Sequence, residues 1–307
     1  MIKVSLTLLI QEVDALDDFL NEIAPSPWLI IHNQAQSSTI LEGYFKSTKD
    51  FKTFRNDAFG ILKTILEHER DLIIKVLEDC EWVHAYKDHF KPWSFKSFHW
   101  IPIWLENQYA TPLNHNYLYL DPGMAFGTGN HETTRLCLEE VLNIESNLIS
   151  KTSLLDLGCG SGIISLTASK LGFKPVLGID IDEDAIRISK ENAVLNSIKS
   201  DVNFSVGELN KLLTCPKFDV VIANLQTDVL IKYANRILTC LSKKGTLILS
   251  GILKTEVKSV VSHYKEITAK NGDFEQITFR HRGEWSVVTI CLQSEKERKQ
   301  KINHLNK

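Results

Sequence analysis

Two glycine-rich stretches in the middle of the chain carry the residue types that predict a ligand site. The first, DPGMAFGTGNHETTR, spans residues 121–135, and the second, LLDLGCGSG, spans residues 154–162. A phosphate loop needs two glycines five residues apart, followed by Lys and then Ser or Thr. In the first stretch Thr128 stands five residues after Gly123, and no lysine is present. The first stretch is therefore not a phosphate loop, and the second has to indicate the ligand.

The second stretch joins a predicted strand to a predicted helix, which is typical of a nucleoside pocket. Gly158 and Gly160 allow the backbone to turn sharply and to approach a ligand closely. The helix that starts beyond Gly162 offers N–H groups without intrahelical partners. The next predicted strand ends at Asp180, whose carboxylate can accept hydrogen bonds from both hydroxyls of an adenosine ribose.

The charge at the end of the first strand indicates which nucleoside is held. Asp156 precedes glycines spaced by two residues, whereas a dinucleotide site has the pattern GxGxxG. A carboxylate at this place repels a pyrophosphate and suits a cationic ligand that bears an amine and a sulfonium. S-adenosylmethionine has both groups and is the favoured cofactor, and a nicotinamide dinucleotide is the alternative.

The second half of the chain alternates apolar strands with helices, which predicts a parallel sheet covered on both faces. The predicted strands are 153–158, 175–180, 201–206, 218–224 and 245–251, and the predicted helices are 161–172, 183–197, 228–242 and 254–270. Residues 274–292 instead indicate two strands around a polar turn, without a helix between them. The fold class is therefore α/β, with a Rossmann-like, mostly parallel sheet that ends in one antiparallel strand, as in methyltransferases.

Residues 1–80 predict a smaller α+β domain of the ferredoxin-like kind. Strands are predicted at 2–10, 28–32, 39–45 and 71–79, and helices at 12–24 and 50–67. In the first strand, alternate residues from Ile2 to Ile10 are apolar, which is the strand period. Such units are usually binding or dimerisation modules, and a purely structural appendage is the second interpretation.

Residues 81–104 form a predicted linker that is rich in aromatic residues and lysines. The favoured interpretation is packing at a hinge between the domains, and base stacking on RNA is the alternative. The residues concerned are Trp82, Tyr86, Phe90, Trp93 and Trp100. The catalytic domain is then expected over 105–293, and 294–307 are expected to be a disordered tail.

Composition excludes several other classes of protein. The formal net charge of −3 gives no overall basic field for nucleic acid, and the six cysteines include no CxxC pair for zinc or a disulfide framework. Apolar runs stay shorter than the roughly eighteen residues of a membrane span, and the first residues do not read as a signal peptide. We therefore expect a cytoplasmic protein without a metal site and without membrane or DNA partners.

The chain resembles the PrmA family, the methyltransferases that modify ribosomal protein L-11. The resemblance extends over most of the chain, and its most distinctive motif is DPGMAFGTGNHETT. The other matching segments are LLDLGCGSG, GIDID, VIANL, LSGIL, GEW and the tryptophan-rich linker. The resemblance implies S-adenosylmethionine contacts at Thr134, Gly158, Asp180 and Asn224, and it suggests a monomer. It also implies that the N-terminal domain docks on L-11, so that lysine side chains or the N-terminal amine are methylated.

The sequence suggests an orienting role for Asn224 and leaves four neighbouring residues open. The side-chain carbonyl of Asn224, with a backbone carbonyl beside it, can accept N–H bonds from the substrate amine and aim its lone pair. His131 and Glu132 are expected to cap the helix that follows rather than to act as acid and base. Gln226 and Thr227 have no assigned role. A methyltransferase acting on RNA or a small molecule, and a regulator that binds cofactor without catalysis, are the alternative functions.

Overall fold

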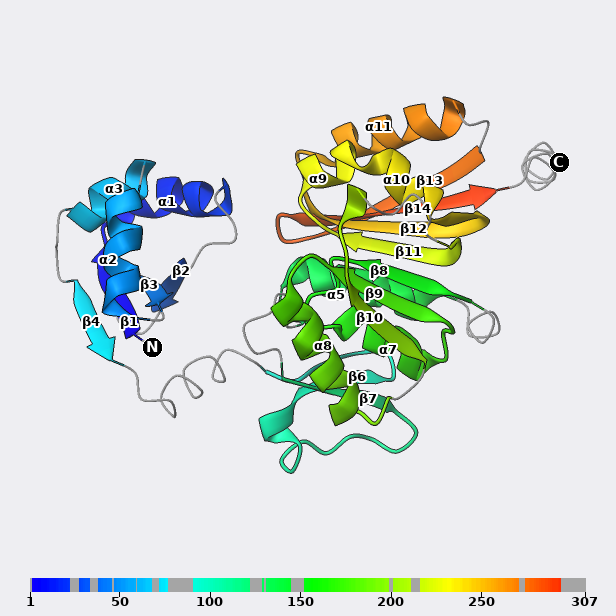
Figure 1. Ribbon diagram of the computed structural model, residues 1–307, viewed down its shortest axis with the longest axis horizontal. Helices are drawn as coiled ribbons and strands as arrows, with labels where there is room; N and C mark the ends of the chain where they lie inside the picture. Colours follow the sequence, from blue (N-terminus) through cyan, green and yellow to red (C-terminus); the bar gives the residue numbers. More distant parts are fainter. Residues whose placement is uncertain are drawn as a thin grey trace. The chain divides into compact units, whose positions relative to one another are not determined.

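The computed structural model describes two compact units, Met1–His89 and Phe90–Lys307, which are treated separately below (Figure 1). The described residues are 2–22, 28–33, 38–45, 47–58, 60–67, 72–76, 91–121, 129, 131–144, 152–198, 201–210, 216–270 and 274–293. Trp82, Tyr86, Phe90, the expected tail and most of residues 122–130 lie outside them. Within the described part, no helix is long and apolar enough to cross a membrane.

Among its described residues, the first unit has a four-stranded antiparallel sheet and three helices. Its elements are β1 (Ile2–Leu8), α1 (Ile10–Glu22), β2 (Trp28–Asn33), β3 (Ser38–Phe45), α2 (Thr48–Asp57), α3 (Gly60–Glu67) and β4 (Ile73–Val76). The strand order is β2-β3-β1-β4, and every neighbouring pair is antiparallel. This is the strand order of a ferredoxin-like unit, which confirms the predicted fold class.

Two sequence-based predictions in this unit were wrong in detail. Ile10 was placed on the buried face of the first strand, but it begins α1 and is 93% exposed. The single helix predicted over 50–67 is two helices, because Ala58 is extended and Gly60 has a φ of +60°. A Cβ at Gly60 would lie 2.6 Å from Cε2 of Phe19, so the break brings the chain against α1.

The second unit is built on a seven-stranded sheet. Its strands are β8 (Leu154–Leu157), β9 (Val176–Asp180), β10 (Val202–Val206), β11 (Phe218–Asn224), β12 (Leu241–Leu253), β13 (Phe274–Arg282) and β14 (Trp285–Gln293). The order is β10-β9-β8-β11-β12-β14-β13, and β14 is antiparallel to both of its neighbours, whereas the other pairs are parallel. The predicted antiparallel strand near the end of a parallel sheet is confirmed.

Helices cover both faces of this sheet. They are α5 (Glu132–Asn143), α7 (Ile163–Leu171), α8 (Glu183–Leu195), α9 (Thr227–Lys232), α10 (Ala234–Thr239) and α11 (Val257–Lys270). In β11, Val220 and Ile222 face a core formed with α5 and α7, whereas Val221 and Ala223 face a core formed with α9 to α11. Both faces are buried, which explains the fully apolar strand sequences. The helix predicted over 228–242 is two short helices that meet at Tyr233.

Residues 91–104, expected to be the second half of a linker, instead fold with the second unit. They form β5 (Trp93–Phe95), β6 (Phe98–Pro102) and the 3₁₀ helix η1 (Ile103–Leu105), and β6 pairs with β7 (Asn116–Leu120). The rings of Trp93 and Trp100 stack with centroids 4.0 Å apart, and Nε1 of Trp100 donates to Oγ1 of Thr167 over 2.9 Å. These tryptophans therefore pack inside the unit and not at a hinge.

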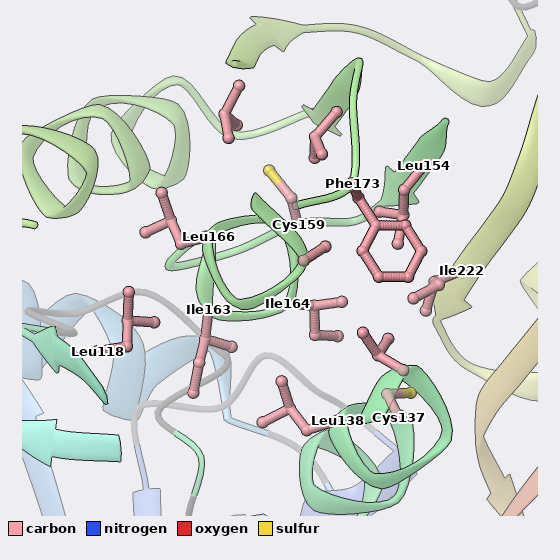
Figure 2. Close-up of a cluster of buried hydrophobic side chains, with 14 of the residues drawn as sticks. Leu118, Cys137, Leu138, Leu154, Cys159, Ile163, Ile164, Leu166, Phe173 and Ile222 are labelled. Atoms are coloured by element: carbon pink, nitrogen blue, oxygen red, sulfur yellow. The ribbon is translucent and has the colours of Figure 1, made fainter. Parts of the chain in front are cut away.

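Replacing Phe173 with Ala is expected to lower the unfolding free energy by about 3–5 kcal/mol, because the change leaves a cavity. Phe173 is 1% exposed and belongs to the core on the side of α7 (Figure 2). The control is Phe279→Ala, because Phe279 is 54% exposed and should change stability by at most about 0.5 kcal/mol. Urea unfolding measures both, and equal losses would contradict this account of the core.

Candidate functional site

The register of three neighbouring strands brings their ends to the same edge of the sheet. In β8, Leu157 is paired with Ile179 of β9 on one side and with Ala223 of β11 on the other. The next residues along the three strands are Gly158, Asp180 and Asn224. Because all three strands are parallel, these residues lie level at the carboxyl ends, where open α/β sheets bind their ligands.

The glycine turn after β8 requires its glycines. Gly158, Gly160 and Gly162 have φ values of +75°, +52° and +79°, which favour glycine. A Cβ at Gly158 would lie 2.6 Å from Cδ2 of Leu225. The absence of a side chain at Gly158 therefore allows the turn after β11 to pack directly on the turn after β8.

Asp180 holds the glycine turn and keeps acceptor sites for a ligand. Its Oδ2 accepts a hydrogen bond from the backbone N–H of Gly160 over 2.9 Å, and its Oδ1 accepts one from Asp182 over 3.0 Å. Each carboxylate oxygen has two lone pairs, so both oxygens can still accept from hydroxyl groups. The half-buried position of Asp180 fits the predicted contact with a ribose.

Asp156 is fully buried and has one unsatisfied oxygen. Its Oδ2 accepts from the backbone N–H of Ser165 over 3.2 Å and from the Ser165 hydroxyl over 2.7 Å, at the start of α7. Its Oδ1 has no hydrogen-bond partner. Burial raises the pKa of Asp156 to about 7, although the bonds from Ser165 oppose this shift. Asp156 thus caps a helix, which the sequence did not predict, and it has one oxygen left for a ligand.

Thr134 lies in the first turn of α5, where a second buried oxygen has no partner. The side chain is fully buried, and Oγ1 makes no hydrogen bond. His131 is the N-cap, and its Nδ1 accepts from the backbone N–H of Thr133 over 3.3 Å. Glu132 lies in the first turn, so the predicted capping is confirmed for His131, with the helix starting one residue earlier than expected.

The GEW motif lies beside this helix start. The rings of His131 and Trp285 meet edge to face with centroids 5.0 Å apart. A Cβ at Gly283 would lie 3.8 Å from Cγ of Glu132. Burial lowers the pKa of His131, and the charge of Glu132 partly offsets this effect. The two motifs therefore lie side by side in the fold, although the sequence separates them widely.

Salt bridges fix α5 against the last strands of the sheet. Arg280 donates to Oε2 of Glu139 over 3.0 Å and to Oε1 of Glu140 over 2.7 and 2.8 Å. Arg282 also pairs with Glu139, whose side chain is only 5% exposed. A carboxylate this deeply buried needs such partners, since an unpaired buried charge is costly. These contacts hold the helix that carries Thr134.

The turn after β11 is fixed on three sides. The Leu225 N–H donates to the carbonyl of Ser250 over 3.0 Å, and a Cβ at Gly251 would lie 2.3 Å from the Leu225 carbonyl oxygen. Thr227 donates to Oε2 of Glu256 over 2.7 Å, which gives this residue a structural role. Gln226 is exposed before α9, without a capping bond. The Asn224 side chain at the end of β11 is half-buried.

Arg135 and Trp93, which the sequence did not connect, contact Gly129 in the first glycine-rich stretch. Nε of Arg135 donates to the carbonyl of Gly129 over 2.9 Å. The Arg135 guanidinium lies 4.9 Å from the centre of the Trp93 ring, and a Cβ at Gly129 would lie 2.9 Å from Nε1 of Trp93. In the sequence, the sign of this contact is a glycine and a tryptophan that pack together. Without the fold, these two residues cannot be recognised as partners.

The residues at this sheet edge fit S-adenosylmethionine. Two buried oxygens without partners, on Thr134 and Asp156, are acceptors that match an amine and a sulfonium cation. Asp180 offers carboxylate oxygens to the hydroxyls of a nucleoside. A sheet of this strand order with this site defines an S-adenosylmethionine-dependent methyltransferase.

Comparison with known proteins places the chain within this class. It belongs to the family described as "Ribosomal protein L11 methyltransferase (PrmA)", whose profile matches residues 13–294. A ribosomal protein L11 methyltransferase of Hydrogenovibrio crunogenus is 33% identical over 84% of this chain and 82% of the relative. One of Staphylococcus saprophyticus is 33% identical over 83% of this chain and 79% of the relative.

A solved structure agrees with this assignment. The crystal structure of ribosomal protein L11 methylase from Lactobacillus delbrueckii subsp. bulgaricus has 27% sequence identity to this chain and a TM-score of 0.58. The match covers 67% of this chain and all of that chain. The family resemblance read from the sequence motifs is confirmed.

Replacing Asp156 with Asn removes a titrating group from the core. The folded protein keeps the Asp156 proton to a pH of about 7, whereas the ordinary pKa is 3.8. Between pH 3.8 and about 7, the folded state thus binds more protons than the unfolded state. The wild type should therefore lose stability relative to the variant as the pH rises through this range. We expect the difference between their unfolding free energies to change by at most about 1.4 kcal/mol per pH unit, measured by urea unfolding of both proteins.

Saturating S-adenosylmethionine is expected to lessen this loss in the wild type, because a cation favours the ionised carboxylate. Adenosine, which lacks the charged end, serves as the control ligand. Parallel pH profiles for wild type and variant would show that Asp156 does not titrate in this window.

Proposed function

We propose that the chain transfers methyl groups from S-adenosylmethionine to amines of ribosomal protein L11, at lysine side chains or the N-terminus. The observation that carries the proposal is the shared level of Gly158, Asp180 and Asn224 at the sheet edge, in a chain whose family match runs over 13–294. The relatives' names supply the substrate, and the site supplies the chemistry.

The cofactor contacts follow from the acceptors at this edge. Asp180 accepts from the ribose hydroxyls, and Gly158 lets the nucleoside approach the backbone. The buried oxygens of Thr134 and Asp156 have no partner, and we propose that they accept from the cationic methionine end. S-adenosylmethionine supplies an electrophilic methyl group on a sulfonium, which becomes a neutral thioether when the methyl group leaves.

Asn224 is proposed to orient the substrate amine. A lysine must lose a proton before its lone pair can attack, which costs about 4–5 kcal/mol at pH 7 for an unperturbed pKa of about 10.4. A site that excludes water lowers this cost by disfavouring the ammonium. The side-chain carbonyl of Asn224 then accepts an N–H bond, which directs the lone pair to the methyl carbon. Positioning and desolvation supply most of the rate increase in this mechanism.

The first unit is proposed to be the substrate-recognition arm, over residues 1–80, joined to the catalytic part by the segment after it. An arm of this kind would let several amines of one substrate reach one site. We also propose that the enzyme works as a monomer in the cytoplasm. An RNA substrate is less favoured, because Trp93 and Trp100 stack on each other and Trp100 is buried.

Replacing Asn224 with Ala is expected to lower kcat about 100-fold, because the amine loses its orientation. Purified L11 and S-adenosylmethionine are incubated with each enzyme, and intact mass counts the methyl groups added. Binding of S-adenosylhomocysteine should stay close to the wild-type affinity. Asn203→Ala, an exposed asparagine on β10, is the control. Full activity of the Asn224 variant removes its proposed role, and an unmodified L11 with the wild type removes the proposed substrate.

Deleting residues 1–80 is expected to abolish methylation of L11 while cofactor binding persists, because the sheet edge belongs to the second unit. Calorimetry with S-adenosylhomocysteine measures cofactor binding, which should persist. Intact mass of L11 measures methylation, which should be lost. A truncated enzyme that methylates L11 at the normal rate would assign the first unit another task.

A further inference from the structure

A buried amide side chain on α8 connects the two glycine-rich stretches. Asn192 is 1% exposed. Its Oδ1 accepts a hydrogen bond from the backbone N–H of Asp121 over 2.9 Å, at the start of the first stretch. Its Nδ2 donates to the backbone carbonyl of Ser161 over 3.0 Å, in the middle of the glycine turn. One side chain thus pairs with two backbone groups from segments far apart in the sequence.

Asn192 lies on the buried face of α8. The buried positions of this helix are Ala185, Ile186, Ile188, Ser189 and Asn192. Among them, Ala185, Ser189 and Asn192 recur at helical spacing. An asparagine on the buried face is costly unless its amide is paired, and both ends of this amide are paired.

Asn196, one turn further along, makes a similar contact without reaching the glycine turn. Its Oδ1 accepts from the Tyr119 N–H over 2.8 Å, and its Nδ2 donates to the Tyr119 carbonyl over 2.6 Å. The Nδ2 also reaches the backbone carbonyl of Asn192 over 2.8 Å. Both asparagines therefore hold the segment from β7 to Asp121. Of the two, Asn192 also bonds Ser161 in the glycine turn, whereas Asn196 does not.

We propose that Asn192 is a positioning residue that fixes the glycine turn against the start of the first stretch, and thereby sets the cofactor affinity. The inference rests on the proposed cofactor site. The Gly160 N–H donates to Asp180, and Asn192 donates to the Ser161 carbonyl, so successive residues of the turn are each held by a side chain. Loss of the bond between Asn192 and Ser161 lets the glycine turn shift. The carboxylate of Asp180, proposed to bind the ribose, then loses its fixed partner, the Gly160 N–H.

The test compares Asn192→Leu with Asn196→Leu in the full-length protein. Each variant keeps a similar side-chain volume and leaves one N–H and one carbonyl of the neighbouring backbone unpaired, so both are expected to lower the Tm. We expect the Kd for S-adenosylhomocysteine, measured by calorimetry, to rise about tenfold or more in Asn192→Leu. The Asn196→Leu variant should stay within about twofold of the wild type. The KM for S-adenosylmethionine should rise with the Kd, while kcat at saturation stays close to normal.

Equal Kd values for the two variants would overturn the proposal, since the effect would then be general destabilisation. An Asn192→Leu protein with wild-type affinity would overturn it as well. Amide hydrogen exchange of the wild type covers the case of a variant that does not fold. The N–H of Asp121 should gain protection when S-adenosylhomocysteine is added, and unchanged exchange there would refute the coupling. The Kd and hydrogen-exchange readouts do not depend on methylation of L11, so their failure can be told apart from failure of the proposed substrate.

Discussion

The hydrogen-bond register of β8 between β9 and β11 is the constraint on which the site depends. Parallel pairing places Leu157 opposite both Ile179 and Ala223, so the three chains leave the sheet at one level. If one strand slipped by one residue relative to its neighbours, its side chains would turn to the other face of the sheet and this alignment would be lost. Burial on both faces opposes such a shift, because Val221 and Ile222 lie in different cores. The packing of the sheet thus stabilises the geometry of the site.

Polar groups inside the unit mark where structure and function meet. Asp156, Glu139 and Asn192 are almost fully buried, and burial of such groups is costly unless hydrogen bonds compensate. Glu139 and Asn192 have their partners within the protein, whereas Asp156 keeps one oxygen without a partner, as does Thr134. The satisfied groups hold segments in place. The unsatisfied groups are where a ligand can supply the missing hydrogen bonds.

The two units bury their sheets in different ways. The first buries one face of an antiparallel sheet under helices, with a core that includes Val4, Leu41 and Phe51. The second covers both faces of a mostly parallel sheet and directs its strand ends to one edge. The tryptophan pair of Trp93 and Trp100 belongs to the second of these structures.

The sequence alone determined the fold class, the succession of strands and helices along both units in outline, the glycine turn and the family. These follow from apolar periodicity and from motifs that are contiguous in the chain, such as residues 154–162. Only the tertiary structure decided that Asn192 joins two such motifs, that Trp285 lies beside His131, and that residues 91–104 fold with the second unit. These contacts join residues distant in sequence, and hydrophobic periodicity records only whether a residue is buried, not which partner it meets.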